Sequence, residues 1–275
     1  MNLGFELMTF GVGAFAGGIG ALLGLGGGVI LMPFLNKVMG LSIDQASGIS
    51  VITIIATSSA ASASRSRLKL ANLRLGMLLE IFTTTGGVFG LWWLGKTSDS
   101  TKEQMFAWTL VLIAIIVISR LDKRNVIKDP NIDVGLLGGR FEEAESGGTV
   151  AYRVKRPALA FIASFIAGVV SNLGIGGGIL KVPVLNTWCG VPIRAAAATS
   201  SLMLGATALI IAADRFAHGQ IVPELAAAAV LGVLAGTQVG TYVQHRSKAK
   251  SHKITLVVLL VVVAALYFTG LGARR

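Results

Sequence analysis

The sequence predicts an all-α integral membrane protein made of two homologous halves, arranged as inverted repeats of about five membrane segments each. Three observations carry this prediction. The chain is strongly apolar, it repeats itself at a fixed offset of 150 residues, and both copies place three consecutive glycines inside an apolar stretch. The third observation predicts that a helix is broken at each Gly-rich motif.

The composition is typical of a membrane protein. The 275 residues are 53% hydrophobic and 13% charged, whereas a soluble domain is roughly 25% charged. Apolar runs of about 18 residues recur along the chain, long enough to cross a hydrocarbon core of roughly 30 Å. Helices satisfy every backbone group within lipid. We therefore expect a multi-pass protein whose main partner is the lipid bilayer.

The net charge of +11 does not indicate nucleic acid. The Lys and Arg residues lie in the connections between apolar runs, where the excess of positive charge on the cytoplasmic side explains them. A nucleic-acid groove would also need aromatic residues interleaved with a basic stripe, and the sequence lacks such a pattern. The sequence does not indicate an oligomeric state.

The repeat aligns each residue with the one 150 positions later, without gaps. Between Gly18 and Asn36, nine of nineteen positions are identical to their counterparts. The register continues through pairs such as Ser50 with Ser200 and Thr57 with Thr207. We therefore divide the chain into a first membrane half (1–120), a connecting stretch (121–156) and a second membrane half (157–275). Residues 120–156 contain eight Lys or Arg and six Asp or Glu, which predicts a solvated cytoplasmic loop.

The membrane segments follow from the apolar runs. A single helix from residue 5 to residue 40 would be about 54 Å long, too long for one crossing. It must break, and the glycine cluster is the expected place. The predicted segments of the first half are 5–23, 26–40, 46–64, 73–95 and 104–120. Those of the second half are 157–173, 176–190, 195–213, 224–244 and 254–271.

The number of segments decides the orientation of the halves. Five segments per half invert the second half and place the connections 65–74, 120–156, 186–194 and 245–253 in the cytoplasm, with four, eight, one and four Lys or Arg. The cations that then face outward are only these six: Lys37, Lys96, Lys102, Arg215, Arg274 and Arg275. Four segments per half keep the halves parallel and force the basic connection 245–253 outside. The distribution of positive charge favours the inverted arrangement.

The glycine motifs predict a binding site for an anion. A helix that restarts after Gly26, Gly27 and Gly28, or after Gly176, Gly177 and Gly178, presents unpaired backbone N–H groups and the positive end of its dipole. Two broken helices in inverted halves are typical of secondary transporters. Close helix packing is the alternative, and for the pairs Gly13 and Gly17, Gly86 and Gly90, and Gly236 and Gly240 it is the favoured reading.

Other polar residues in the apolar segments are candidates for the same site. Lys181 follows the second motif where the first half has Leu31, and an intramembrane lysine indicates a function unless it reaches the lipid headgroups. Asn36, Asn186 and Asn172 either donate to a ligand or cap and pack. A further group of hydroxyl residues, in 57–67 and 199–201, either joins helices or lines a polar path.

Glu80 is the candidate for proton coupling, because it is the acid most deeply placed in a predicted segment. A structural ion pair is the alternative. The three His residues lie in connections without metal-ligand spacing, and no Ser/His/Asp grouping is present, so we expect no metal, no cofactor and no enzymatic activity. The single cysteine, Cys189, is expected to be a packed residue.

The twin motifs "GLGGG…P…N" and "GIGGG…P…N", at the start of two halves separated by a charged loop, resemble the TauE/SafE family of sulfite exporters. The resemblance covers nearly the whole chain. It implies a location in the bacterial inner (plasma) membrane. It also implies transport, in the direction of export, of small sulfur-containing anions such as sulfite, sulfoacetate and other organosulfonates. An anion channel of the same architecture and a membrane protein that does not transport remain alternatives.

Overall fold

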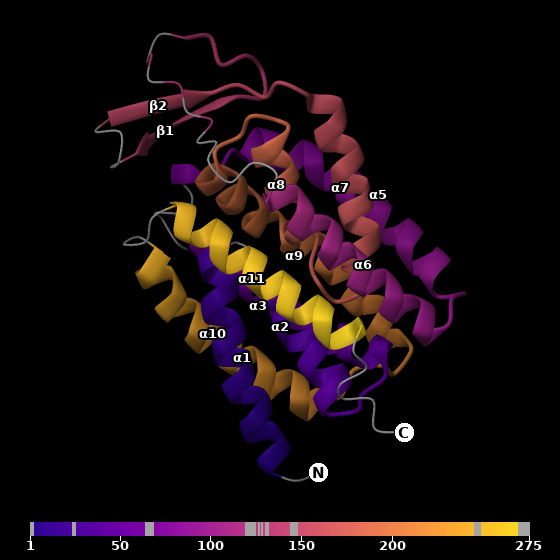
Figure 1. Cartoon of the computed structure of the whole chain (residues 1–275). Coiled ribbons are helices and arrows are strands. Elements are labelled where there is room, and N and C mark those ends of the chain that lie inside the picture. Colours follow the sequence, from indigo (N-terminus) through magenta and orange to yellow (C-terminus); the bar gives the residue numbers. More distant parts are fainter. Residues whose placement is uncertain are drawn as a thin grey trace.

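The protein is mostly helical in the computed structural model (Figure 1), which describes residues 3–23, 26–63, 69–118, 132–143, 148–244 and 249–268, with 125, 127 and 129. The first half contains α1 (Leu3–Leu23), α2 (Gly28–Pro33), the π-helix η1 (Phe34–Val38), α3 (Ile43–Ala63), α5 (Leu73–Leu94) and α6 (Asp99–Ile118). The second half contains α7 (Pro157–Ser171), α8 (Gly178–Thr187), α9 (Ile193–Ala217), α10 (Pro223–Gln244) and α11 (Ala249–Phe268).

Among the described residues, five stretches of helix are long and apolar enough to cross a membrane. They are Leu3–Ala21, Leu73–Leu94, Asp99–Ile118, Ile193–Ala217 and Pro223–Tyr242, and shorter apolar helices cover Gly28–Val38, Pro157–Ser171 and Val257–Phe268. Large apolar side chains such as Phe15, Trp108 and Leu231 are each 62% exposed, as expected of a surface that faces lipid. These features agree with the predicted helical, multi-pass membrane protein.

The helix bounds lie close to the predicted segments, with the largest differences at the starts of α11 and α6. Helix α11 begins at Ala249, five residues before the predicted start at 254, and α6 differs by the same amount. We predicted a start at residue 104, but the helix begins at Asp99. The Ser98 hydroxyl accepts a hydrogen bond from the Thr101 N–H (3.3 Å) and so caps the helix, and Lys102 is neutralised by Asp44 at 2.7 Å. Ser98 and Lys102 therefore both have polar partners within the fold.

The short helices α2 and α8 run back alongside the helices that precede them. The Thr9 hydroxyl of α1 donates to the sulfur of Met39, which follows η1 (3.4 Å). In the second half, the Lys155 N–H, just before α7, donates to the Cys189 carbonyl, just after α8 (3.0 Å). Each half therefore opens with a returning helical pair whose turn contains the glycine motif; Gly24 and Leu25 lie outside the described residues.

The two halves pack through a set of contacts that is preserved when the halves are exchanged. Helix α1 packs on α10 as α7 packs on α5, α10 contacts α3 as α5 contacts α9, and α3 contacts α9 directly. Glycines allow these approaches: a Cβ at Gly236 would lie 1.8 Å from the Ala14 carbonyl oxygen, and one at Gly86 would lie 2.0 Å from that of Phe165. The predicted packing role of these glycine pairs is confirmed.

The connecting stretch departs from the prediction of a loop within an all-α fold. It forms an antiparallel hairpin of β1 (Gly139–Glu143) and β2 (Gly148–Tyr152). Phe141, Val150 and Tyr152 are 5%, 2% and 2% exposed, so apolar burial holds the strands in place. Charged residues occupy three of the five positions of β1, so the sequence of this strand does not stand out from a solvated loop.

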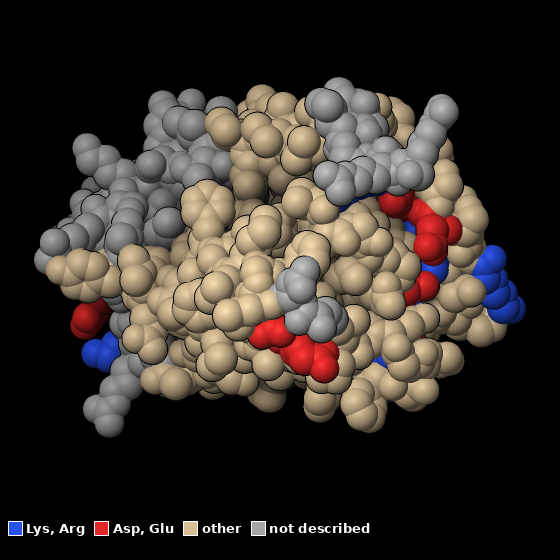
Figure 2. Space-filling view, turned by 90° about the horizontal axis from the view of Figure 1, so that it is seen from below, with Lys and Arg blue, Asp and Glu red and all other residues tan. Residues whose placement is uncertain are grey.

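The two ends of the molecule differ. The start of α1 and the end of α11 lie at one end, and the β hairpin lies at the opposite end (Figure 1). A view onto the end away from the hairpin shows scattered charged residues on a mainly uncharged surface (Figure 2).

Candidate functional site

The two glycine motifs meet at the centre of the fold. A Cβ at Gly28 would lie 2.4 Å from the carbonyl oxygen of Gly174, so only glycine permits this approach. Helix α3 joins the two motifs, because the Ser50 hydroxyl donates to that same Gly174 carbonyl (2.6 Å) and the Ser47 hydroxyl donates to the Asn172 carbonyl (2.7 Å). The motifs, 150 residues apart in sequence, form one buried region.

The backbone at both motifs takes conformations that favour glycine. Gly26 and Gly27 have φ of 77° and 78°, and Gly174 and Gly176 have φ of 79° and 77°. Helix α2 begins after Gly27 and helix α8 begins after Gly177. Some of the first N–H groups bond back to the glycine motifs, since Ile30 donates to the Gly27 carbonyl (3.2 Å) and Ile179 donates to the Gly176 carbonyl (3.4 Å).

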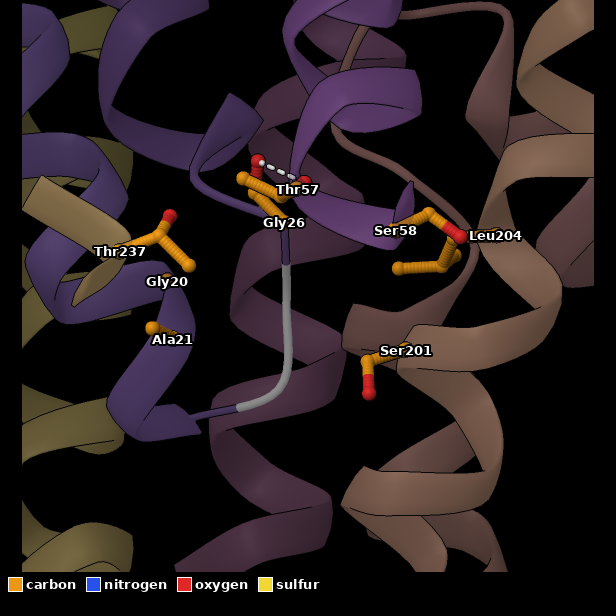
Figure 3. Close-up of a pocket in the computed structure, with 8 residues that line it drawn as sticks. All are labelled: Gly20, Ala21, Gly26, Thr57, Ser58, Ser201, Leu204 and Thr237. Atoms are coloured by element: carbon orange, nitrogen blue, oxygen red, sulfur yellow. Dashed lines mark hydrogen bonds between the residues drawn. The ribbon is translucent and has the colours of Figure 1, made fainter. Parts of the chain in front are cut away.

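A small pocket that four hydroxyl residues help to line adjoins the first motif (Figure 3). Its lining residues are Gly20, Ala21, Gly26, Thr57, Ser58, Ser201, Leu204 and Thr237. The Thr57 hydroxyl lies 3.4 Å from the Gly26 carbonyl oxygen, to which it donates. The pocket measures about 10 Å³, room for about one water molecule. Of the hydroxyl residues that the sequence offered either as joints between helices or as a polar lining, Thr57, Ser58 and Ser201 line this pocket. Ser58 also joins two helices, because it donates to the Leu202 carbonyl of α9 (3.2 Å).

Lys181, Glu80, Thr83 and Thr207 form a second polar group, the Lys181 cluster. The Lys181 ammonium donates to the Glu80 carboxylate (3.2 Å) and to the Thr83 hydroxyl (3.1 Å). The other oxygen of Glu80 accepts from the Thr207 N–H (3.0 Å) and from the Thr207 hydroxyl (2.5 Å). The Lys181 side chain is 3% exposed and stands in the first turn of α8, so this cluster lies directly after the second glycine motif.

Helix α9 contributes backbone groups to both polar regions. The Gly205 N–H donates to the Ser58 hydroxyl (3.0 Å), which donates in turn to the Leu202 carbonyl (3.2 Å). Together with the bond from the Thr207 N–H to Glu80, these contacts place backbone polar groups of α9 between the pocket and the Lys181 cluster. Sequence reasoning missed this role, because backbone groups leave no signal in residue identity.

The three candidate asparagines bond to backbone in the structure. The amide groups of Asn36 and Asn186 each donate to the carbonyl five residues later, on Leu41 and Val191, at 3.0 Å. They lie at the far ends of the short helices, away from the glycine motifs. Asn172 donates to the Gly87 carbonyl (3.0 Å), and its side-chain oxygen is buried without a hydrogen-bond partner among the described residues.

The connecting stretch, including Tyr152 of the β hairpin, contacts the ends of two helices that carry the Lys181 cluster. Asn72 caps α5 by accepting from the Leu75 N–H (3.0 Å), and its amide donates to the Leu137 carbonyl and the Tyr152 hydroxyl (2.9 and 3.1 Å). At α8, Asn125 donates to the Asn186 carbonyl. Burial raises the pKa of the Tyr152 phenol, and the hydrogen bond from Asn72 partly opposes this shift.

Ion pairs gather at the end of the molecule away from the hairpin. Asp44, at the start of α3, contacts Lys102 of α6 at 2.7 Å and Arg215 of α9 at 2.8 Å. Lys37 contacts Glu103 at 2.6 Å. Three of the cations predicted to face outward are therefore neutralised by acids. Among the described residues, no group of three His, Cys, Asp or Glu could hold a metal ion.

A helical membrane protein with two similar halves and polar groups buried where they meet has the architecture of a membrane transporter. The chain belongs to the sulfite exporter TauE/SafE family, which it matches over residues 9–267. It is similar to the "Probable membrane transporter protein YunE" of Bacillus subtilis (strain 168), with 24% identity over 269 residues that cover 94% of this chain and 96% of the relative. No solved structure matches the chain. The predicted family resemblance is confirmed.

Proposed function

We propose that the protein is a secondary transporter that exports a small sulfur-containing anion, such as sulfite, sulfoacetate or another organosulfonate, across the bacterial inner membrane. The family's description as sulfite exporters supports both the substrate class and the direction. The anion binds between the two glycine motifs, where the starts of α2 and α8 direct N–H groups toward the centre.

One observation carries the assignment of an anion site. Lys181 places a full positive charge in the first turn of α8, directly after Gly176, Gly177 and Gly178, with its side chain 3% exposed. A cation this deeply buried in a membrane protein is costly, and the snorkelling alternative requires an exposed end. Its position puts this charge at the helix start, where the Glu80 carboxylate is its partner at 3.2 Å and an anion can replace that carboxylate.

The arrangement of the helices supports inverted halves. The first half starts at the end away from the hairpin and leads to the hairpin, while the second half starts at the hairpin and leads back (Figure 1). The helix contacts stay the same when the two halves are exchanged, which supports a pseudo-two-fold relation between the halves. The end away from the hairpin has scattered, acid-paired cations (Figure 2), which supports an outward-facing end and a cytoplasmic stretch at 121–156.

The packing at the centre favours a transporter over an open channel. The pocket beside Gly26 holds about one water molecule, and the Lys181 cluster is closed by its own hydrogen bonds. Substrate passage therefore requires a change of conformation, as in alternating access of inverted repeats.

Flux in proteoliposomes tests this function. We expect radiolabelled sulfite to leave loaded vesicles with saturable kinetics, and organosulfonates to compete. The double variant Glu80→Gln with Lys181→Met removes the positive charge without leaving an unpaired acid, and it should bind the anion about tenfold to a hundredfold more weakly than Glu80→Gln alone. Lys181→Arg should be intermediate, because charge remains but geometry changes. Sulfite efflux that does not saturate, or that is no faster than efflux from loaded vesicles without the protein, contradicts the proposal.

A further inference from the structure

The Lys181 cluster contains one cation and one acid that fully engage each other. The ammonium of Lys181 donates to one oxygen of Glu80 and to Thr83, at 3.2 and 3.1 Å. The second oxygen of Glu80 accepts two hydrogen bonds from Thr207. The side chains of the pair are 3% and 11% exposed. In this state Lys181 has no free charge to offer to a substrate.

An anion that binds Lys181 must displace the Glu80 carboxylate. A buried charge that loses its partner is strongly destabilising, and more so within a membrane. Protonation of Glu80 removes this cost, because the anion then replaces the carboxylate as the counter-ion of Lys181. Binding of the anion and binding of a proton are thus favourable together and unfavourable apart.

We propose, building on the proposed anion transport, that Glu80 takes up one proton for each anion that Lys181 binds, so that the two are carried together. The ion pair between Lys181 and Glu80 breaks, a proton from solution forms an O–H bond on Glu80, and the anion pairs with Lys181. For a monovalent anion the charge of the site does not change. Efflux then proceeds whenever the outward anion gradient exceeds the inward proton gradient.

The hydrogen bonds of the cluster suit both states of Glu80. Thr207 donates twice to one carboxyl oxygen, and that oxygen is an acceptor whether the group is ionised or protonated. The oxygen that faces Lys181 is the one left to bind the proton. The Thr83 hydroxyl commits its own proton to the Leu79 carbonyl (2.8 Å), so its oxygen can accept from the new O–H group when Lys181 leaves.

No other described titratable group competes at this position. Helix α7, which packs on α5, has no titratable side chain, and Lys181 is the one titratable side chain of α8. Helix α9 carries Arg194, Asp214 and Arg215 near its ends, at least seven residues from Thr207, or about 10 Å along the axis. On α5 itself, Arg74 is six residues from Glu80, about 9 Å. The protonation step therefore belongs to Glu80.

The repeat limits this coupling to one site per chain. The positions in the other half that correspond to Lys181, Glu80 and Thr83 are Leu31, Val230 and Val233. None of them can bind a proton or an anion by charge. The stoichiometry expected from the sequence and the structure is one proton per anion.

Calorimetric titration of the purified full-length protein with methanesulfonate counts the protons, because the charge of this sulfonate stays constant between pH 5 and pH 8. Titrations in buffers of different ionisation enthalpy should give an uptake of about one proton per anion in the range where free Glu80 is ionised. In that range the affinity should fall about tenfold per pH unit, as one-proton linkage requires.

Three variants isolate the pair. Glu80→Gln should bind without proton uptake and with an affinity independent of pH, and adding Lys181→Met should weaken its binding at least tenfold. Glu103→Gln, which alters the second Lys–Glu pair with Lys37 at 2.6 Å, should titrate like the wild type. Proton uptake that persists in Glu80→Gln, or wild-type affinity that is equal at pH 5 and pH 8, overturns the proposal. Absence of methanesulfonate binding also overturns it, whereas saturable sulfite flux would leave the proposed function standing.

Discussion

Gly28 shows at the level of one residue why the motif is built from glycine. A Cβ there would lie 2.4 Å from the Gly174 carbonyl oxygen and 2.7 Å from the Ser50 hydroxyl oxygen. The neighbouring Gly27 also needs its φ of 78°. The close approach of the Gly28 and Gly174 backbones and the start of α2 both require glycine. The packing of the two motifs and the formation of the candidate site therefore depend on the same residues.

Gly28→Ala should therefore lower the thermal stability of the detergent-solubilised protein. Overpacking of a tight contact costs about 1–3 kcal/mol. Gly11→Ala is the matched control, because a Cβ at that helical glycine meets nothing within 4 Å, and we expect it to leave stability unchanged or slightly higher. Equal unfolding temperatures for the two variants would show that the motifs do not meet as described.

The residues of the Lys181 cluster were predicted singly but not as a pair. A lysine and a glutamate inside apolar runs stand out in sequence, because charge in a membrane segment is costly. Their contact spans 101 positions and depends on how α5 and α8 pack, which residue identity does not encode. Asn72 and Thr207 carried no such signal, since neutral polar residues are common in membrane helices.

At the level of elements, the helices were predictable and the hairpin was not. Long apolar runs fix membrane segments, and the glycine motifs mark where α1 and α7 give way to shorter helices. The stretch 121–156 contains thirteen charged residues and no apolar run long enough to span a membrane, which is why it was predicted to be a solvated loop. The strands form there because Phe141 and Tyr152 find buried places on the helix ends, a tertiary effect that pattern analysis does not detect.

The docking of the hairpin should depend on pH through Tyr152. Its folded-state pKa is raised above 10.0 by burial, so the stability it contributes is fully present below pH 10.0 and is lost as the pH rises through the folded-state pKa. We expect protease cleavage of residues 127–152 to accelerate as the pH increases beyond 10.0, when protease activity is corrected at each pH. Tyr152→Phe should lose this dependence, and an unchanged pH profile in that variant would assign the effect to another group.

At the level of the whole molecule, inverted halves make a specific prediction about sidedness. Thr149 is exposed on the hairpin and His218 is exposed between α9 and α10, with 63% of its side chain accessible. In a Cys189→Ser background, which removes the single buried native thiol, we expect Cys introduced at His218 to react with an impermeant reagent in intact cells. Cys introduced at Thr149 should react only after the membrane is permeabilised. The reverse pattern would contradict the assigned orientation.

The repeat gives the two halves the same helix packing but not the same polar residues. Exchange of the halves preserves the helix contacts. However, the repeat positions that correspond to Lys181 and Glu80 are Leu31 and Val230, which carry no charge. The scaffold of two similar halves thus carries an asymmetric site: a pocket with hydroxyl groups beside Gly26 and a charged cluster beside Gly176, each built from residues of both halves. In the proposed transport, the halves open this site alternately to either side, and the single pair of Lys181 and Glu80 supplies its charged groups.

The most direct test of anion binding at the glycine motifs is a crystal structure with 2-bromoethanesulfonate, whose bromine is located by anomalous scattering. We expect one anomalous peak between Gly26–Gly28 and Gly176–Gly178. The sulfonate should lie within hydrogen-bonding distance of Lys181, and the Glu80 carboxylate should no longer contact Lys181. A bound sulfonate at another place, with the pair between Lys181 and Glu80 intact, would contradict this expectation.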